Sequence, residues 1–146
     1  MKLTPKKLKV SANINMAYVI NYMHKFLGFS YEDAFMKFIS AQCYNELCDL
    51  NSGLCTAMSP EVLFLFEEDS KIPLNENDDK ISRAFDIDAK LQYIVNMTEA
   101  FREAEKIPPK KFRAYISKNN VWKMLEDNYE KLSSLKREDV IKYLRG

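Results

Sequence analysis

The sequence predicts an all-α protein made of two diverged three-helix units that pack together. Only 3 Gly and 5 Pro occur in 146 residues, which leaves few sites for the tight turns of a many-stranded sheet. Apolar residues recur at spacings of three and four along most of the chain, as on the buried faces of helices. In addition, residues 16–68 and 91–146 share a weak collinear pattern, which indicates an internal duplication.

The duplication predicts how the chain is divided. The segment 18–21 returns as 93–96, and the segment 38–40 returns as 115–117. At a constant offset of 78, the first-half residues Tyr44, Leu47, Asp49, Leu54 and Val62 correspond to Trp122, Leu125, Asp127, Leu132 and Val140. We therefore predict a first unit over 1–68, a connector over 69–80 and a second unit over 81–146, which can also form one compact domain. Apolar helix patterns also converge by chance, which is the alternative explanation.

The first unit is expected to contain helices over 13–27, 30–48 and 59–66, with a possible short extended segment near 54–58. Gly28 ends the first of these helices, because glycine adopts the left-handed conformation without steric cost. Ser30 is placed to accept a hydrogen bond from an unpaired amide at the start of the next helix. Ser59 and Pro60 open the last one, since the fixed φ of proline suits the first helical turn.

The second unit is expected to contain helices over 79–105, 109–125 and 136–144. Polar and turn-forming residues dominate the connector before it. The sequence Ile107-Pro108-Pro109 forces an extended segment between the first two helices, because a residue that precedes proline avoids the helical region. Glu138 and Asp139 lie in the first turn of the last helix, where the helix dipole favours negative charge.

Composition and charge narrow the class of protein. The chain is 47% hydrophobic and 29% charged, which is typical of a soluble globular protein, and it has no apolar run of the roughly 20 residues that a membrane span needs. Four lysines lie within residues 1–9, but no apolar segment follows, so we expect no secretory signal. Three cysteines, an odd number, argue against a disulfide framework and for a reducing, cytoplasmic location.

The sequence contains little that indicates catalysis, and we expect no enzyme activity and no cofactor. It has no glycine-rich phosphate loop, no nucleophile elbow and no His-Glu-x-x-His motif. His24, Cys43, Cys48 and Cys55 could in principle bind zinc, but the cysteines lack the paired two-residue spacing of structural zinc sites. We therefore predict a structural histidine and no metal site.

One basic segment gives an alternative function. The net charge is +1, but residues 91–146 hold 12 basic and 8 acidic groups. Within them, four cations lie close to aromatic residues, an arrangement in which cations contact phosphates and a ring stacks on a base. The candidate residues for binding nucleic acid are Lys106, Lys110, Lys111, Arg113 and Tyr115.

An excess of apolar residues indicates protein binding. The chain has 9 Phe, 8 Tyr, 7 Met and 1 Trp, and residues 16–38 are too aromatic for a three-helix unit of some 55 residues to bury fully. Either the two units pack together and absorb this surface, or a partner covers what remains. The candidate anchors for a partner are Tyr18, Tyr22, Phe29, Tyr31 and Phe35.

The first half also resembles a known family. The residues that carry the resemblance are Phe29 to Phe35 together with Ser40, Tyr44, Leu47, Asp49, Ser52 to Leu54, Ser59 to Glu61, Phe66 and Glu67. They resemble a family of small, uncharacterised bacterial helical domains, often encoded beside genes for ADP-ribosyltransferase-like proteins in an arrangement that looks like toxin and antitoxin. In the second half, residues 52–54 correspond to Glu130-Lys131-Leu132, so the surface of that copy differs.

These observations lead to one expected function and two alternatives. We expect a non-catalytic protein-binding module, with a bacterial toxin or other effector as its partner, as the resemblance implies. The first alternative is a regulatory protein that binds nucleic acid through residues 106–113. The second is a phage or mobile-element inhibitor of a bacterial defence system, which would bind protein by the same physics. The oligomeric state is left open.

Overall fold

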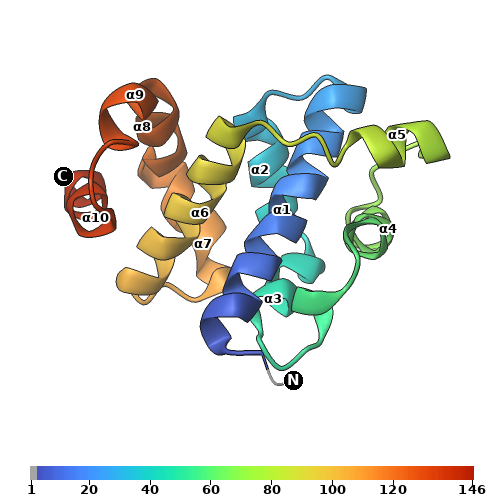
Figure 1. The fold of residues 1–146 in the computed structure, drawn as a ribbon, viewed down its shortest axis with the longest axis horizontal. Coiled ribbons are helices and arrows are strands. Elements are labelled where there is room, and N and C mark those ends of the chain that lie inside the picture. Colours follow the sequence, from blue (N-terminus) through green and yellow to red (C-terminus); the bar gives the residue numbers. More distant parts are fainter. Residues whose placement is uncertain (1–2) are drawn as a thin grey trace.

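The fold is all-α, as the sequence predicts. The computed structural model describes residues 3–146, and these form ten α-helices, one short 3₁₀ helix and no strand (Figure 1). The elements are α1 (Pro5–Leu27), α2 (Tyr31–Ile39), α3 (Gln42–Cys48), η1 (Leu54–Thr56), α4 (Ser59–Ser70), α5 (Asp78–Arg83), α6 (Ala89–Ala104), α7 (Pro109–Lys118), α8 (Val121–Asp127), α9 (Tyr129–Leu132) and α10 (Arg137–Arg145). Within residues 3–146, no helix combines the length and apolarity needed to cross a membrane.

Helix α1 runs through the middle of the fold and is longer than expected. It begins at Pro5, eight residues before the predicted start, because the Thr4 hydroxyl accepts a hydrogen bond from the Lys7 amide and proline suits the first turn. It ends at Gly28, which has a φ of 78°, as predicted. The Ser30 side chain then caps α2 by accepting from the Asp33 amide at 3.1 Å, also as predicted.

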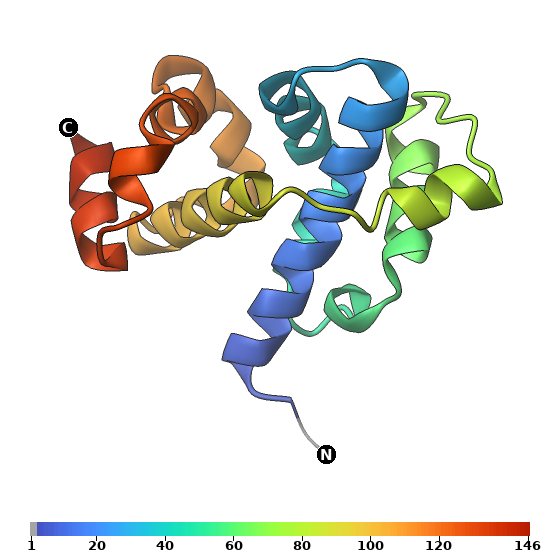
Figure 2. The same cartoon turned by 45° about the horizontal axis from the view of Figure 1, so that its top comes forward.

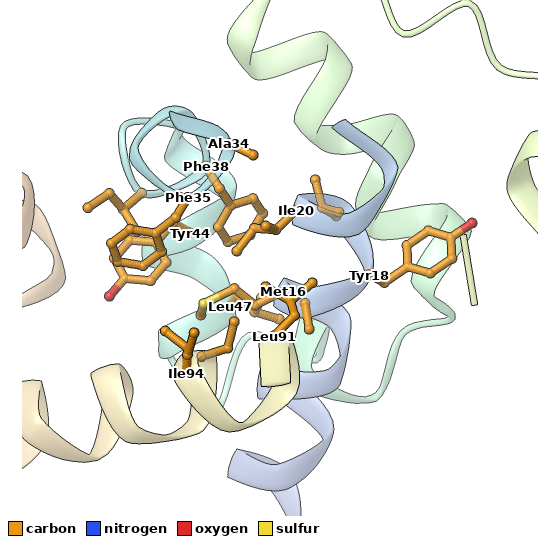
Figure 3. Packing of buried hydrophobic residues seen from close by; sticks show 14 of the residues in the cluster. Met16, Tyr18, Ile20, Ala34, Phe35, Phe38, Tyr44, Leu47, Leu91 and Ile94 are labelled. Carbon is orange, nitrogen blue, oxygen red and sulfur yellow. The ribbon is translucent and has the colours of Figure 1, made fainter. Parts of the chain in front are cut away.

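Helices α2, α4 and α6 and the 3₁₀ helix η1 all pack against α1 (Figures 1 and 2). Together they bury one continuous apolar core, in which Met16 and Ile20 of α1 lie towards Phe38 and Leu47 (Figure 3). Tyr18 points to the opposite side of the same helix (Figure 3). Because α1 is covered on several sides, its aromatic excess is absorbed by internal packing.

Three predicted helices are each interrupted. The expected helix 30–48 breaks at Ala41, whose backbone is extended, and 109–125 breaks at Asn119 for the same reason. The expected helix 79–105 separates into α5 and α6, because the Asp88 side chain caps a new helix by accepting from the Lys90 amide at 2.7 Å. The possible extended segment at 54–58 contains the 3₁₀ helix η1.

Side chains of α1 hold the chain between α4 and α6 in place by donating hydrogen bonds to the backbone carbonyl groups of that chain. The Tyr22 hydroxyl donates to the Leu74 carbonyl at 2.8 Å, and the Tyr18 hydroxyl donates to the Ile81 carbonyl at 2.7 Å. Asn21 donates to the Ala84 carbonyl at 2.9 Å. The segment between α5 and α6 crosses α1 in Figure 2, and these hydrogen bonds hold the chain from Leu74 to Ala84 against that helix.

The order of the helices follows the offset of the predicted duplication. Helix α4 begins at Ser59, and α10 begins at Arg137, 78 positions later. Leu47 and Leu125 are both buried, as are Val62 and Val140. The division of the chain into two related units, and the boundary over 69–80, stay predictions.

Candidate binding groove

A groove of about 680 Å³ opens between the N-terminal half of α1 and helix α6, with α10 at its edge. It is lined by residues from these three helices and from the end of α3: Pro5, Lys6, Lys9, Val10, Asn13, Ile14, Cys48, Leu50, Gln92, Asn96, Ala100, Arg102, Glu103 and Arg137. In Figure 2, this end of α1 extends away from helices α2 and α5. We refer to this feature as the α1–α6 groove.

Two exposed apolar side chains, one helical turn apart, line the α1 wall of the groove. Val10 is 54% exposed and Ile14 is 44% exposed, whereas most large apolar side chains of α1 further along the helix are fully buried. Both side chains project on one face, because residues four apart on a helix lie above one another. Leu50 and Ala100 add apolar surface on other parts of the lining.

Beneath the groove lies a buried network of charged groups centred on Glu99 of α6. The Glu99 side chain has no exposed surface. Its carboxylate accepts from Lys9 Nζ at 2.8 Å, from Arg102 Nη2 at 3.0 Å and from the Tyr44 hydroxyl at 2.6 Å. The Cys48 thiol lies 3.6 Å from the same carboxylate. The network therefore joins α1, α3 and α6 at one point.

The electrostatics of this network keep Glu99 ionised. Burial alone would raise the pKa of the Glu99 carboxyl, but Lys9 and Arg102 outweigh burial and lower this pKa to about 2. Burial opposes the charge of Lys9 as well, yet Glu99 and Glu103 raise the pKa of its ammonium group. Burial and the nearby Glu99 carboxylate raise the pKa of the Cys48 thiol to about 12. The thiol thus stays protonated and is a poor nucleophile.

Charge is balanced beneath the groove but not at its rim. Lys9 also pairs with Glu103 at 2.6 Å, and Arg102 donates to the Ile107 carbonyl at 3.0 Å as well as to Glu99, so each cation is paired with a carboxylate. Lys6 on α1 and Arg137 on α10 are exposed and form no ion pair with any residue in 3–146. The groove therefore combines an apolar wall with two unpaired positive charges.

Polar side chains between α1 and α6 are largely engaged with one another. Gln92 donates to the Asn13 carbonyl at 3.3 Å and to the Asn96 side chain at 3.0 Å. The side-chain oxygen of Asn13 is buried and has no hydrogen-bond partner within residues 3–146. The lining thus offers few free polar groups, and its main exposed features are the apolar wall and the charged rim.

The five predicted partner anchors do not form one surface in the structure. Tyr18, Tyr22 and Phe35 have no exposed surface, so in this fold they belong to the core and cannot contact a partner. The two tyrosines hold the chain after α4 through their hydroxyls, as described above. Phe29 and Tyr31 are partly buried, and Tyr31 stacks on His24 with ring centroids 3.9 Å apart. None of the five lines the α1–α6 groove.

The basic segment lies elsewhere, at the start of α7. Lys106, Lys110, Lys111 and Arg113 are all exposed, and none forms an ion pair within the described chain. Arg113 donates to the Ser40 hydroxyl. Tyr115 is partly buried, with its ring near two others: Phe101 at 5.9 Å and Phe112 at 6.4 Å. Tyr115 is therefore a poor platform for a base.

The zinc candidates do not converge. All three cysteines are free thiols, and among residues 3–146 no group of three His, Cys, Asp or Glu side chains is arranged to hold a metal ion. His24 instead lies with Nδ1 2.8 Å from the Phe29 carbonyl. The Cys55 thiol lies 3.4 Å from the Leu47 carbonyl.

Sequence reasoning missed the α1–α6 groove, although two signals were present. Thr4-Pro5 is a helix-start signal, and reading it would have placed Val10 on the same helix as Ile14. Glu99 and Arg102 lie three residues apart on α6, a spacing at which opposite charges pair on one side of a helix. Comparisons with protein-family models, with curated proteins and with solved structures find no match for this chain.

Proposed function

We propose that this protein is a non-catalytic protein-binding module and that the α1–α6 groove is its contact surface. The observation that carries the proposal is the exposure of Val10 and Ile14 side by side, above charged groups that already satisfy one another. As the resemblance of the first half implies, the partner is a toxin or other effector. A protein of a bacterial defence system would be bound by the same surface.

The network centred on Glu99 favours binding because it holds the helices of the groove together before a partner binds. Lys9, Glu99 and Arg102 join two helices through hydrogen bonds of 2.8 to 3.3 Å, so the wall positions do not have to be ordered when a partner arrives. Full burial of an aliphatic side chain contributes about 1.5–3 kcal/mol. Since Val10 and Ile14 are each about half exposed, covering both contributes roughly 2 kcal/mol.

Site-specific photo-crosslinking tests this function. The protein with a photoreactive amino acid at position 10 is expressed in cells of the source organism, and the proteins that cross-link to it are identified by mass spectrometry. Position 64 is the matched control, because Phe64 is 44% exposed, against 54% for Val10, but lies on α4 and does not line the groove. A protein captured at position 10 and absent at position 64 supports the proposal. Equal recovery at both positions, or none at position 10, overturns it.

One observation favours nucleic-acid binding as a second candidate. The four cations Lys106, Lys110, Lys111 and Arg113 are exposed and lack acidic partners in the described chain, so they are free to contact phosphates. Electrophoretic mobility shifts with generic duplex DNA and RNA at low salt test it. Binding that weakens steeply with salt, and that Lys110→Glu with Lys111→Glu abolishes, supports this candidate. No shift at low salt rules it out.

A further inference from the structure

We infer that the α1–α6 groove takes an amphipathic helix whose apolar stripe is flanked on both sides by acidic side chains. This inference rests on the proposed protein-binding function and specifies the chemistry of the partner. It follows from the secondary structure of the groove walls, the length of the apolar wall and the positions of the unpaired charges.

The groove walls favour a helix over an extended segment. Val10 and Ile14 lie within α1, and Gln92, Asn96 and Ala100 lie within α6. In the interior of a helix, the backbone N–H and C=O groups are used in the helix's own hydrogen bonds. An extended segment would find no free row of backbone groups to pair with, as it would at a sheet edge. A helix brings its backbone already paired and offers only side chains to the groove.

The length of the α1 side of the groove suits a short helix. The lining residues of α1 run from Pro5 to Ile14, which corresponds to about 13 Å along the helix axis at about 1.5 Å per residue. A bound helix of about nine residues would span this wall and place apolar side chains at positions i, i+3, i+4 and i+7 against Val10 and Ile14. Leu50 and Ala100 would contact the same stripe.

The charges indicate the flanks of the bound helix. Lys9 and Arg102 are neutralised by Glu99 and Glu103. The uncompensated charges of the lining are Lys6 on α1 and Arg137 on α10, and α10 packs against α6. One cation thus belongs to each wall. A helix lying between them gains charge complementarity when acidic residues lie on both sides of its apolar stripe.

A selection experiment tests this occupant directly. The probe is a displayed library of 15-residue helices with a fixed leucine stripe and randomised flanking positions. The wild-type protein is the bait, and a Val10→Glu/Ile14→Glu variant is used for counter-selection. Both substitutions are at exposed helix positions, so we expect circular dichroism to show that the variant keeps its helical content. We expect the enriched peptides to carry Asp or Glu on both flanks.

Charge reversal supplies the second arm. For a selected peptide, Lys6→Glu with Arg137→Glu is expected to weaken binding about tenfold, because two favourable surface pairs become repulsive. Repeating the selection on this double variant is expected to enrich Lys and Arg at the same positions. Enriched peptides without an acidic preference, or peptides that bind the Val10→Glu/Ile14→Glu variant equally well, overturn the inference.

Three further outcomes are distinguishable. Self-association of the wild-type protein in sedimentation experiments, lost on Val10→Glu, would assign the groove to a second copy of this chain and overturn the inference. If cross-linking at position 10 captures a partner but the selection shows no acidic preference, only the class of occupant fails. If cross-linking at position 10 captures nothing, the proposed function itself fails, whatever peptides are selected.

Discussion

The substitution Glu99→Gln tests the physical account of the charged network below the groove. It keeps the size of the side chain but removes the negative charge that Lys9 and Arg102 share. At neutral pH, a carboxyl whose pKa is lowered from 4.5 to about 2 contributes about 3 kcal/mol to the free energy of unfolding. An independent figure agrees, because removing one partner of a buried ion pair costs about 3–5 kcal/mol.

The pH dependence of this effect has a defined sign. Because the folded-state pKa of Glu99 lies below its unfolded value, its contribution is fully present above pH 4.5 and is lost as the pH falls towards 2. Urea unfolding of wild-type protein and the Glu99→Gln variant should therefore differ by about 3 kcal/mol at pH 7 and by about 1 kcal/mol at pH 3.

The matched control is Glu103→Gln. Glu103 also pairs with Lys9, but its side chain is 51% exposed, so the loss should be no more than about 1 kcal/mol. A loss below about 1 kcal/mol for Glu99→Gln at pH 7 would show that the ionised Glu99 carboxylate does not stabilise the fold. A difference from wild type that stays constant between pH 7 and pH 3 would show the same.

Three other predictions concern Tyr22, Cys48 and Gly28. Tyr22→Phe leaves the Leu74 carbonyl without its donor, so urea unfolding should show a loss of about 1–2 kcal/mol and hydrogen exchange in residues 71–77 should accelerate; unchanged exchange would contradict this. Because burial and the nearby Glu99 carboxylate raise the pKa of the Cys48 thiol to about 12, a thiol reagent at pH 8 should label it slowly in the folded protein and rapidly in urea. Rapid labelling without urea would count against that burial. Gly28→Ala should lower the melting temperature by the equivalent of about 1 kcal/mol, since φ is 78° there and no atom crowds the new Cβ; an unaltered melting temperature would show that the backbone relaxes.

Local signals allowed much of the fold to be predicted. The all-α fold class, the end of the first helix at Gly28 and the helix cap at Ser30 depend on residues close in sequence, and the structure confirms them. The breaks at Ala41 and Asn119 were missed because the apolar spacing continues across them. There, the chain changes direction so that both flanking helices can reach the same core, and this requirement comes from tertiary packing.

The site was harder to predict, because exposure depends on which helices surround a residue. Tyr18 and Tyr22 looked like surface anchors, since a three-helix unit could not bury them, but the chain that follows α4 covers them. Val10 lies in a lysine-rich segment that showed no apolar helix pattern, yet its side chain is exposed beside the groove. Two partners of Glu99, Lys9 and Tyr44, lie 90 and 55 residues away in the sequence, and no local pattern brings such distant positions together.

The affinity of the cross-linked partner for two variants, measured by isothermal titration calorimetry, tests most directly whether the α1–α6 groove is the contact surface. Val10→Glu places a charge on the apolar wall of the groove, and Phe64→Glu places the same charge on another exposed apolar site, on α4. We predict that Val10→Glu weakens binding at least about tenfold, which corresponds to about 1.4 kcal/mol, and that Phe64→Glu binds as wild type does. Wild-type affinity of Val10→Glu would contradict the claim that the α1–α6 groove is the contact surface.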